Sequence, residues 1–280
     1  MATRKIPTKI INISANNYVG KIGEIFYDIT TANLKWSDGT TAGGQAFVGG
    51  TPTWPVINTA GPGGPSTIAI GNTAGETSQG NYAVAIGHGA SHDTQGDSAI
   101  GIGYLAGGEN QSIEAIAIGY GAGIYSQGLR AIAIGNTAGA SQQGQYAVAI
   151  GPYAGYNIQG QLAVAIGPFA GQTYQSHGAV AIGPFAGNTS QGVNAVAIGN
   201  IAGETSQGEY AVAIGFGAGS NAQGNTSIII NATGAPLDQT TANTFTVKPV
   251  RYIGNSAVAI AAGFKPTWYN PDTGEFVYAD

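Results

Sequence analysis

Three residues in one short segment have side chains that can bind a metal ion. His88 and His92 are four positions apart, and Asp93 follows directly. On a helix this spacing would place both imidazoles on one face, as in a metal site. These residues fall instead in a turn of the β-type repeat described below, so exposed turn side chains are expected. We predict no metal site and no bound cofactor.

Other patterns that could support catalysis are weak. Glu109 and Glu114 lie near each other in sequence but without a second acidic pair, so a glycosidase pair of carboxylates is poorly supported. The run AIGIGYLAG contains G-x-G, yet no helix and no lysine follow to hold a phosphate. The glycine turns carry no regular aspartate of the kind that binds calcium in GGxGxD repeats. We therefore predict that the protein is not an enzyme, while cleavage of surface glycans stays open as an alternative.

The composition excludes several further classes of protein. Glycine accounts for 47 of the 280 residues, charged residues for 8% and hydrophobic residues for 43%, and there is no cysteine. Disulfide frameworks and thiolate metal sites are therefore excluded. The net charge is −5, and between Ser66 and Asn231 the only basic residue is Arg130, so a nucleic-acid groove is not expected.

Apolar runs of the length needed for targeting or membrane insertion are missing from the sequence. The N-terminal MATRKIPTKIINIS is basic but lacks an apolar stretch of the length found in secretory signals. No run of about 18 apolar residues occurs elsewhere. We expect synthesis in a cytoplasm and no insertion into a membrane.

A repeat of sixteen residues dominates the sequence. Its consensus is A-V-A-I-G-x-x-A-G-x-x-S-Q-G-x-x, and its first glycine recurs without insertion or deletion from Gly71 to Gly215, with Asn231 in the same place in an eleventh copy. Apolar residues alternate with period two before this glycine, which is typical of a β-strand with two distinct faces. The residue before the glycine is always isoleucine: Ile70, Ile86, Ile102, Ile118, Ile134, Ile150, Ile166, Ile182, Ile198, Ile214 and Ile230. We expect this column, with the Val/Ile column two residues earlier, to form the structural core.

Glutamine occupies a fixed position in the second half of the repeat. Ten glutamines at one register predict a ladder of stacked side-chain amides, as in other stacked β-structures. The alternative is a turn residue that bonds to its own backbone, and both can hold together. The column consists of Gln79, Gln95, Gln111, Gln127, Gln143, Gln159, Gln175, Gln191, Gln207 and Gln223.

The period defines the fold class. Sixteen residues are too few for a helical repeat but suit one coil of a parallel β-roll or β-helix, with two short strands and two tight turns. We predict an all-β protein with about eleven such coils in residues 66–231. Residues 1–65 should form an N-terminal β region with a Pro/Gly linker, and residues 232–280 a C-terminal cap. Both flanking regions are expected to contain β-hairpins, from Glu24 to Trp36 and from Trp268 to Tyr278.

Aromatic residues favour the positions just after the repeat glycine. They suggest either packing at corners between neighbouring chains or a surface that contacts sugars or other ligands. The candidates are Tyr104, Tyr120, Tyr153, Phe169, Phe185 and Phe216.

A single coil of this kind is thin. The free energy gained from the little apolar surface that it buries is small compared with the entropy cost of ordering sixteen residues. If the Val/Ile and Ile side chains face inward, a flat alanine face is left outside. Such a face is unfavourable in water and suited to close packing of chains. We therefore predict a homo-oligomer, with threefold symmetry as the arrangement that suits a fibre.

Two resemblances give this architecture a context. The AVAIG units and the run NTSIIINAT resemble the head domains of trimeric bacterial autotransporter adhesins, which implies a trimeric parallel β-roll, although that family's usual unit is shorter. The flanking segments Gly23–Gly44 and Ile230–Arg251, and the ending WYNPDTGEFVYAD, are similar to segments of bacteriophage tail fibres, particularly those of cyanobacterial phages.

These resemblances imply a structural virion protein, a tail fibre or spike that attaches to a host surface through several identical weak sites. Its partners would be its own copies, other virion proteins and a surface glycan or protein receptor, and its location would be the virion. A capsid decoration or head-fibre protein and a bacterial surface adhesin are the alternatives. An ice-binding solenoid is disfavoured, because Asp93, Glu109 and Tyr125 interrupt the column of threonines that it would need.

Overall fold

The computed structural model describes residues 66–250 continuously and, outside this range, short segments at 8–11, 19, 21, 25–28, 33–37, 39–40, 45–46, 267–270 and 275–278. The chain divides into two compact units, Met1–Val56 and Ile57–Asp280. No helix occurs among the described residues. The predicted Pro/Gly linker and the turn between Asn270 and Glu275 lie outside the described residues.

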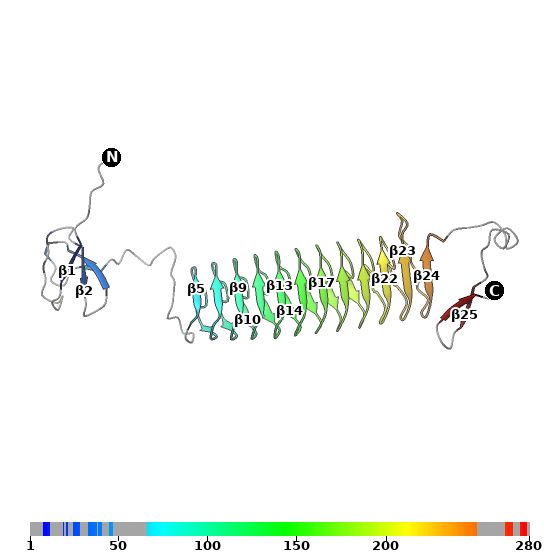
Figure 1. The fold of residues 1–280 in the computed structure, drawn as a ribbon, viewed down its shortest axis with the longest axis horizontal. Helices are drawn as coiled ribbons and strands as arrows, with labels where there is room; N and C mark the ends of the chain where they lie inside the picture. Colours follow the sequence, from blue (N-terminus) through cyan, green and yellow to red (C-terminus); the bar gives the residue numbers. More distant parts are fainter. Residues whose placement is uncertain are drawn as a thin grey trace, which may run out of the picture. The chain divides into compact units, whose positions relative to one another are not determined.

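The repeat region folds as a parallel β-solenoid, as its period predicts. Each coil contributes one strand to a first sheet, and these strands stack as successive rungs in chain order (Figure 1). Residues sixteen apart are direct partners; for example, Val148 pairs with Val164 and Ile150 with Ile166. The strands of the first sheet are β5 (Ile68–Ile70), β7 (Val84–Ile86), β9 (Ile100–Ile102), β11 (Ile116–Ile118), β13 (Ile132–Ile134), β15 (Val148–Ile150), β17 (Val164–Ile166), β19 (Val180–Ile182), β21 (Val196–Ile198), β22 (Val212–Gly215), β23 (Ile228–Asn231) and β24 (Phe245–Lys248).

The second half of each coil forms a second, shorter parallel sheet. Single bridges from Thr189 to Thr205 and from Thr205 to Asn221 continue its register beyond the last strand. Its strands are β6 (Ser78–Gln79), β8 (Thr94–Gln95), β10 (Glu109–Gln111), β12 (Tyr125–Gln127), β14 (Ser141–Gln143), β16 (Asn157–Gln159), β18 (Thr173–Gln175) and β20 (Thr189–Gln191).

The solenoid extends beyond the eleventh repeat. Strand β24 pairs in parallel with β23, and Ile228 lies opposite Phe245, so the connecting coil is one residue longer than the others. At this end Ile229 replaces alanine inside the coil, and Leu237 packs against the core cluster that contains Ile229. The ordered sheet therefore runs past residue 231, which the sequence suggested as its boundary.

The flanking segments contain the predicted hairpins. In the N-terminal unit, β2 (Ile25–Asp28) pairs antiparallel with β3 (Asn33–Trp36). That sheet also contains β1 (Thr8–Ile11) and β4 (Gln45–Ala46). In the second unit, β25 (Thr267–Asn270) pairs antiparallel with β26 (Glu275–Tyr278).

The interior of the coil is built from alanine, which corrects the predicted orientation of the strands. On β15, Ala149 is fully buried whereas Ile150 is 37% exposed. The same holds along the rod, where alanines before the isoleucine and at two turn positions have almost no exposed surface. The prediction that the isoleucine column forms the structural core is therefore wrong. The buried residue is the alanine one position earlier, and in the single chain both β-branched columns point outward. The reason is spatial, because the regular coils leave room between the two sheets only for methyl groups and one glutamine side chain each.

Glycines at two places in the coil keep the chain this thin. The glycine after each isoleucine has a positive φ, and a Cβ on Gly135 would come within 2.8 Å of the backbone of Gly151 in the next coil. Another glycine covers the buried glutamine, and a Cβ on Gly155 would lie 2.7 Å from Gln159 Cδ. Larger residues at these places would force neighbouring coils or the amide ladder apart.

Two neighbouring coils each break this pattern once, and the two exceptions compensate for each other. Ser91 stands where most coils have the glycine that covers the glutamine, and it is fully buried. Gly101 stands where all other repeats except the last have alanine, and a Cβ there would collide with Ser91 Oγ. The interior thus holds a fixed volume, shared between neighbouring coils.

This compensation predicts non-additive stability. Gly101→Ala should lower the free energy of unfolding by about 1–3 kcal/mol, because it overpacks the interior against Ser91. Ser91→Gly should restore most of that loss when it is combined with Gly101→Ala. Chemical denaturation of the parent, both single variants and the double variant would measure the coupling, and strictly additive effects would contradict it.

Candidate functional site

The most extensive candidate surface is an apolar stripe on the outer face of the first sheet. Each coil contributes two β-branched side chains, and several are more than a third exposed, including Ile68 at 42%, Ile118 at 36% and Ile214 at 38%. The stripe consists of the isoleucine column given above and of Ile68, Val84, Ile100, Ile116, Ile132, Val148, Val164, Val180, Val196, Val212 and Ile228. Apolar surfaces of this extent are uncommon on single soluble chains and are typical of surfaces that contact another molecule.

The predicted glutamine ladder is present, and it lies inside the coil. Gln143 Nε2 donates a hydrogen bond to Gln159 Oε1 at 3.0 Å, and Gln159 Nε2 donates to Gln175 Oε1 at 3.0 Å. Equivalent bonds join most successive members of the column. Each amide nitrogen also donates to a carbonyl of the first sheet, such as that of Val148 at 2.9 Å from Gln159. The ladder therefore links neighbouring coils and the two sheets within each coil.

The ladder is interrupted at two places. Gln79 Oε1, Gln95 Oε1 and Gln143 Oε1 are buried and have no hydrogen-bond partner among the described residues. Their amide nitrogens still donate to carbonyls of the first sheet. The hydrogen bonds between side-chain amides of neighbouring coils are therefore missing at these two steps, while the hydrogen bonds from the amides to the first sheet remain. Nothing in the structure explains why these two steps differ.

The candidate aromatic residues form two separate stacks at the corner that follows the first sheet. Tyr104 lies between His88 and Tyr120, with ring centroids 5.3 and 5.1 Å apart. Tyr153, Phe169 and Phe185 form the other stack in the adjacent column, at 5.2 and 4.9 Å. Phe216 is 41% exposed and belongs to neither stack. Their near-parallel rings stabilise the corner and leave aromatic surface exposed.

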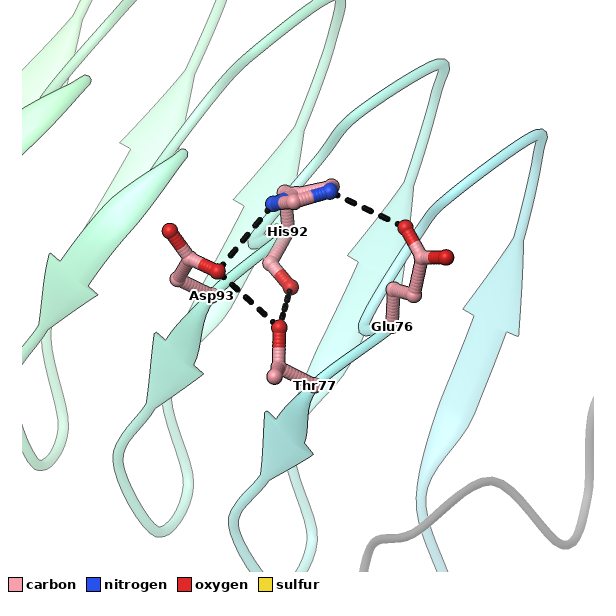
Figure 2. A network of polar contacts seen from close by, with 4 residues as sticks. All are labelled: Glu76, Thr77, His92 and Asp93. Atoms are coloured by element: carbon pink, nitrogen blue, oxygen red, sulfur yellow. Dashed lines mark hydrogen bonds and ion pairs between the residues drawn. The ribbon is translucent and has the colours of Figure 1, made fainter.

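His92 lies between two carboxylates contributed by different coils (Figure 2). Its Nε2 is 2.9 Å from Glu76 Oε2, and its Nδ1 is 3.2 Å from Asp93 Oδ1. Thr77 Oγ1 donates hydrogen bonds to the carbonyl of His92 at 2.8 Å and to Asp93 Oδ1 at 3.0 Å. This exposed network joins the first two coils. His88, the other member of the predicted histidine pair, stacks on Tyr104 instead.

An ion pair occupies the opposite corner of the coil. Arg130 donates two hydrogen bonds to Glu114, at 2.7 Å from Nε and 3.2 Å from Nη2, and its guanidinium lies 5.9 Å from the ring centre of Tyr146. These hydrogen bonds and the positive charge of Arg130 lower the pKa of the Glu114 carboxyl, against a smaller opposing effect of burial. The same bonds and charge raise the pKa of Arg130. Both partners are exposed, so the pair adds little to stability.

Sequence reasoning had a usable signal for both polar groups. Glu76 and His92 are sixteen residues apart, as are Glu114 and Arg130, and the period stacks such residues directly. Within the part of the chain that the structure describes, no group of three or more His, Cys, Asp or Glu residues is arranged to hold a metal ion. Nor does that part contain a helix of the length and apolarity needed to span a membrane.

The buried ladder predicts a large difference between two glutamines of one coil. Gln159→Met should lower the free energy of unfolding by about 2–5 kcal/mol, because the carbonyl of Val148 and the amide of Gln143 lose buried partners. Gln161→Met should have little effect, since Gln161 is exposed and makes only a weak 3.3 Å contact with Gln145. Denaturant unfolding of both variants would measure the difference, and equal effects would argue against a buried ladder.

The ion pair predicts a shift in titration. Arg130→Gln should raise the pKa of Glu114 toward its ordinary value, as followed by NMR of the labelled carboxyl carbon. Because the folded pKa is lowered, any stability that the pair adds is present above the ordinary glutamate pKa and lost as pH falls through the lowered value. Leu162→Gln, further along the same column, is the control, and an unchanged Glu114 titration in Arg130→Gln would contradict the pairing.

Comparisons with protein families, curated proteins and solved structures found no match to this chain.

Proposed function

We propose that the protein is a structural fibre protein whose solenoids associate side by side as a homotrimer, and that it serves a virion as a tail fibre attaching to a host surface. The observation that carries this proposal is the apolar stripe on the first sheet. The alanine face that the sequence suggested as the contact surface is inside the coil. The β-branched side chains are therefore the surface that a partner would cover.

The energetics favour covering this stripe. Removing the exposed third of one such side chain from water is worth about 0.5–1 kcal/mol, and the stripe offers two of these side chains in every coil. A rotation axis parallel to the rod would bring the same coils of neighbouring chains together, so the stripe would pack against itself along its length. Threefold symmetry is what the resemblance to trimeric adhesin heads implies.

The virion assignment rests on the sequence of the flanks. The segments that resemble phage tail fibres include both regions where the structure has β-hairpins, β2–β3 and β25–β26. A rod of stacked coils with a different β unit before it suits a fibre that separates an attachment point from a receptor. Several copies of one weak site on such a fibre would bind a surface by avidity.

Assembly is tested by mass in solution. The parent protein should sediment near three times its chain mass of 28.0 kDa. Ile150→Asp should shift the mass toward that of a single chain, because threefold packing would bury like charges without partners. Gln142→Asp is the matched control, since Gln142 is exposed on the second sheet and should leave the mass unchanged. A parent protein that sediments as a single 28 kDa chain would overturn the trimer.

The location is tested on purified particles. An antibody against the full chain should label phage tails in electron micrographs. Labelling of capsids alone would favour the head-fibre alternative, and particles that lack the protein would overturn the virion assignment.

A further inference from the structure

A hollow on the surface of the described solenoid is lined by side chains from several neighbouring coils. It has a volume of about 430 Å³ and lies where the corner after the first sheet meets the outer face of the second sheet. Its lining runs from Leu105 to Asn157 and therefore crosses several coils. A volume of this size is within the range of small-molecule sites, roughly 300–1,000 Å³.

Small residues at two adjacent positions create the floor of the hollow. Gly121 follows Leu105 in one column, and Ala140 lies between Ile124 and Tyr156 in another. Gly121 and Ala140 are both buried, so they form the base, and the larger members of each column stand around it. Both positions vary from coil to coil in the consensus, so the hollow arises from the small residues that these coils carry there.

Three tyrosines supply aromatic surface around the hollow. Tyr120, Tyr125 and Tyr156 are 57%, 49% and 39% exposed. Tyr120 stacks on Tyr104 with only 10° between the rings, and Tyr156 packs on Tyr153 at 5.7 Å. Two of the three rings are thus held in place before any ligand arrives, which lowers the entropy cost of binding.

The remaining polar lining is neutral. Thr137, Ser141 and Asn157 contribute hydroxyl and amide groups, and no charged side chain lines the hollow. One of the two sheet neighbours of Tyr125 is Glu109, which would repel an anionic ligand, and the other is Ser141. We propose that this hollow binds a neutral saccharide, whose C–H faces pack on the tyrosine rings and whose hydroxyls bond to these polar groups.

The site remains open in the proposed assembly. Tyr125, Ser141 and Asn157 belong to strands β12, β14 and β16 of the second sheet, whereas the apolar stripe projects from the first. This inference rests on the proposed function for its biological meaning, because it names the class of receptor that the fibre would contact. The geometry of the hollow does not depend on that function.

The structure provides a substitution that fills the hollow without disturbing the backbone. A Cβ on Gly121 would approach only Thr137 Cγ2 within 4 Å, at 3.4 Å. Leu105 already has a positive φ of 53° in the same column, close to the 58° of Gly121. Gly121→Leu should therefore fold normally. Thr73→Leu, in the same column and outside the hollow, is the matched control.

The full chain would be applied to an array of neutral and acidic oligosaccharides, and the strongest neutral ligand would then be titrated by calorimetry. We expect binding of neutral members, a loss of affinity of about tenfold or more in Gly121→Leu, and unchanged affinity in Thr73→Leu. Tyr125→Ser, which copies the next coil, should also weaken binding by removing one ring. Circular dichroism would confirm that each variant is folded.

Three outcomes would overturn the site: no binding of any neutral member, preference for acidic members, or equal affinity in the parent and in folded Gly121→Leu. The proposed function fails separately. A trimeric virion protein that binds no neutral saccharide would remove this inference alone, and a single chain that binds one through Gly121 would remove the trimer alone.

Discussion

The narrow space between the two sheets determines the rest of this structure. It admits methyl groups, such as those of Ala149 and Ala165, and one extended glutamine amide per coil. A coil of sixteen residues, with two short strands joined by tight glycine-containing turns, is too short to enclose a wider interior. Interior apolar burial per coil is therefore small, and hydrogen bonds between coils carry much of the order.

The amide ladder and the apolar stripe both follow from this restriction. A glutamine in so thin an interior stays satisfied only by bonding to the amide of the next coil and to carbonyls of the opposite sheet, as Gln159 does. In the regular coils, side chains as large as Ile150 point outward, and Ile229 at the end of the repeat is the exception that lies inside. The chain thus forms a regular single solenoid and at the same time leaves an apolar surface that only another molecule can cover.

The period of the repeat made most of the fold predictable, but not which side of each strand faces inward. Spacing of sixteen residues placed Val148 opposite Val164 and predicted the glutamine ladder, because stacked coils repeat their contacts. Alternation along Val148–Ile150 indicated a strand with two faces. Because valine and isoleucine are more hydrophobic than alanine, the Val/Ile face was predicted to point inward. The width of the interior decides which face points inward. The sequence indicates a narrow interior through alanine at two further positions of nearly every coil, such as Ala147 and Ala154. The hollow at Gly121 was not predictable from a consensus, since it arises from the residues at positions that the consensus leaves variable.

The orientation of the strands is tested most directly by thiol labelling, since the chain has no cysteine of its own. In Ala149→Cys the thiol should react only as fast as the protein unfolds, at every protein concentration. In Ile150→Cys it should react readily in dilute protein and become protected as concentration rises and chains associate. Free reaction of the thiol in folded Ala149→Cys, together with protection in Ile150→Cys at all concentrations, would contradict the alanine interior and the outward stripe.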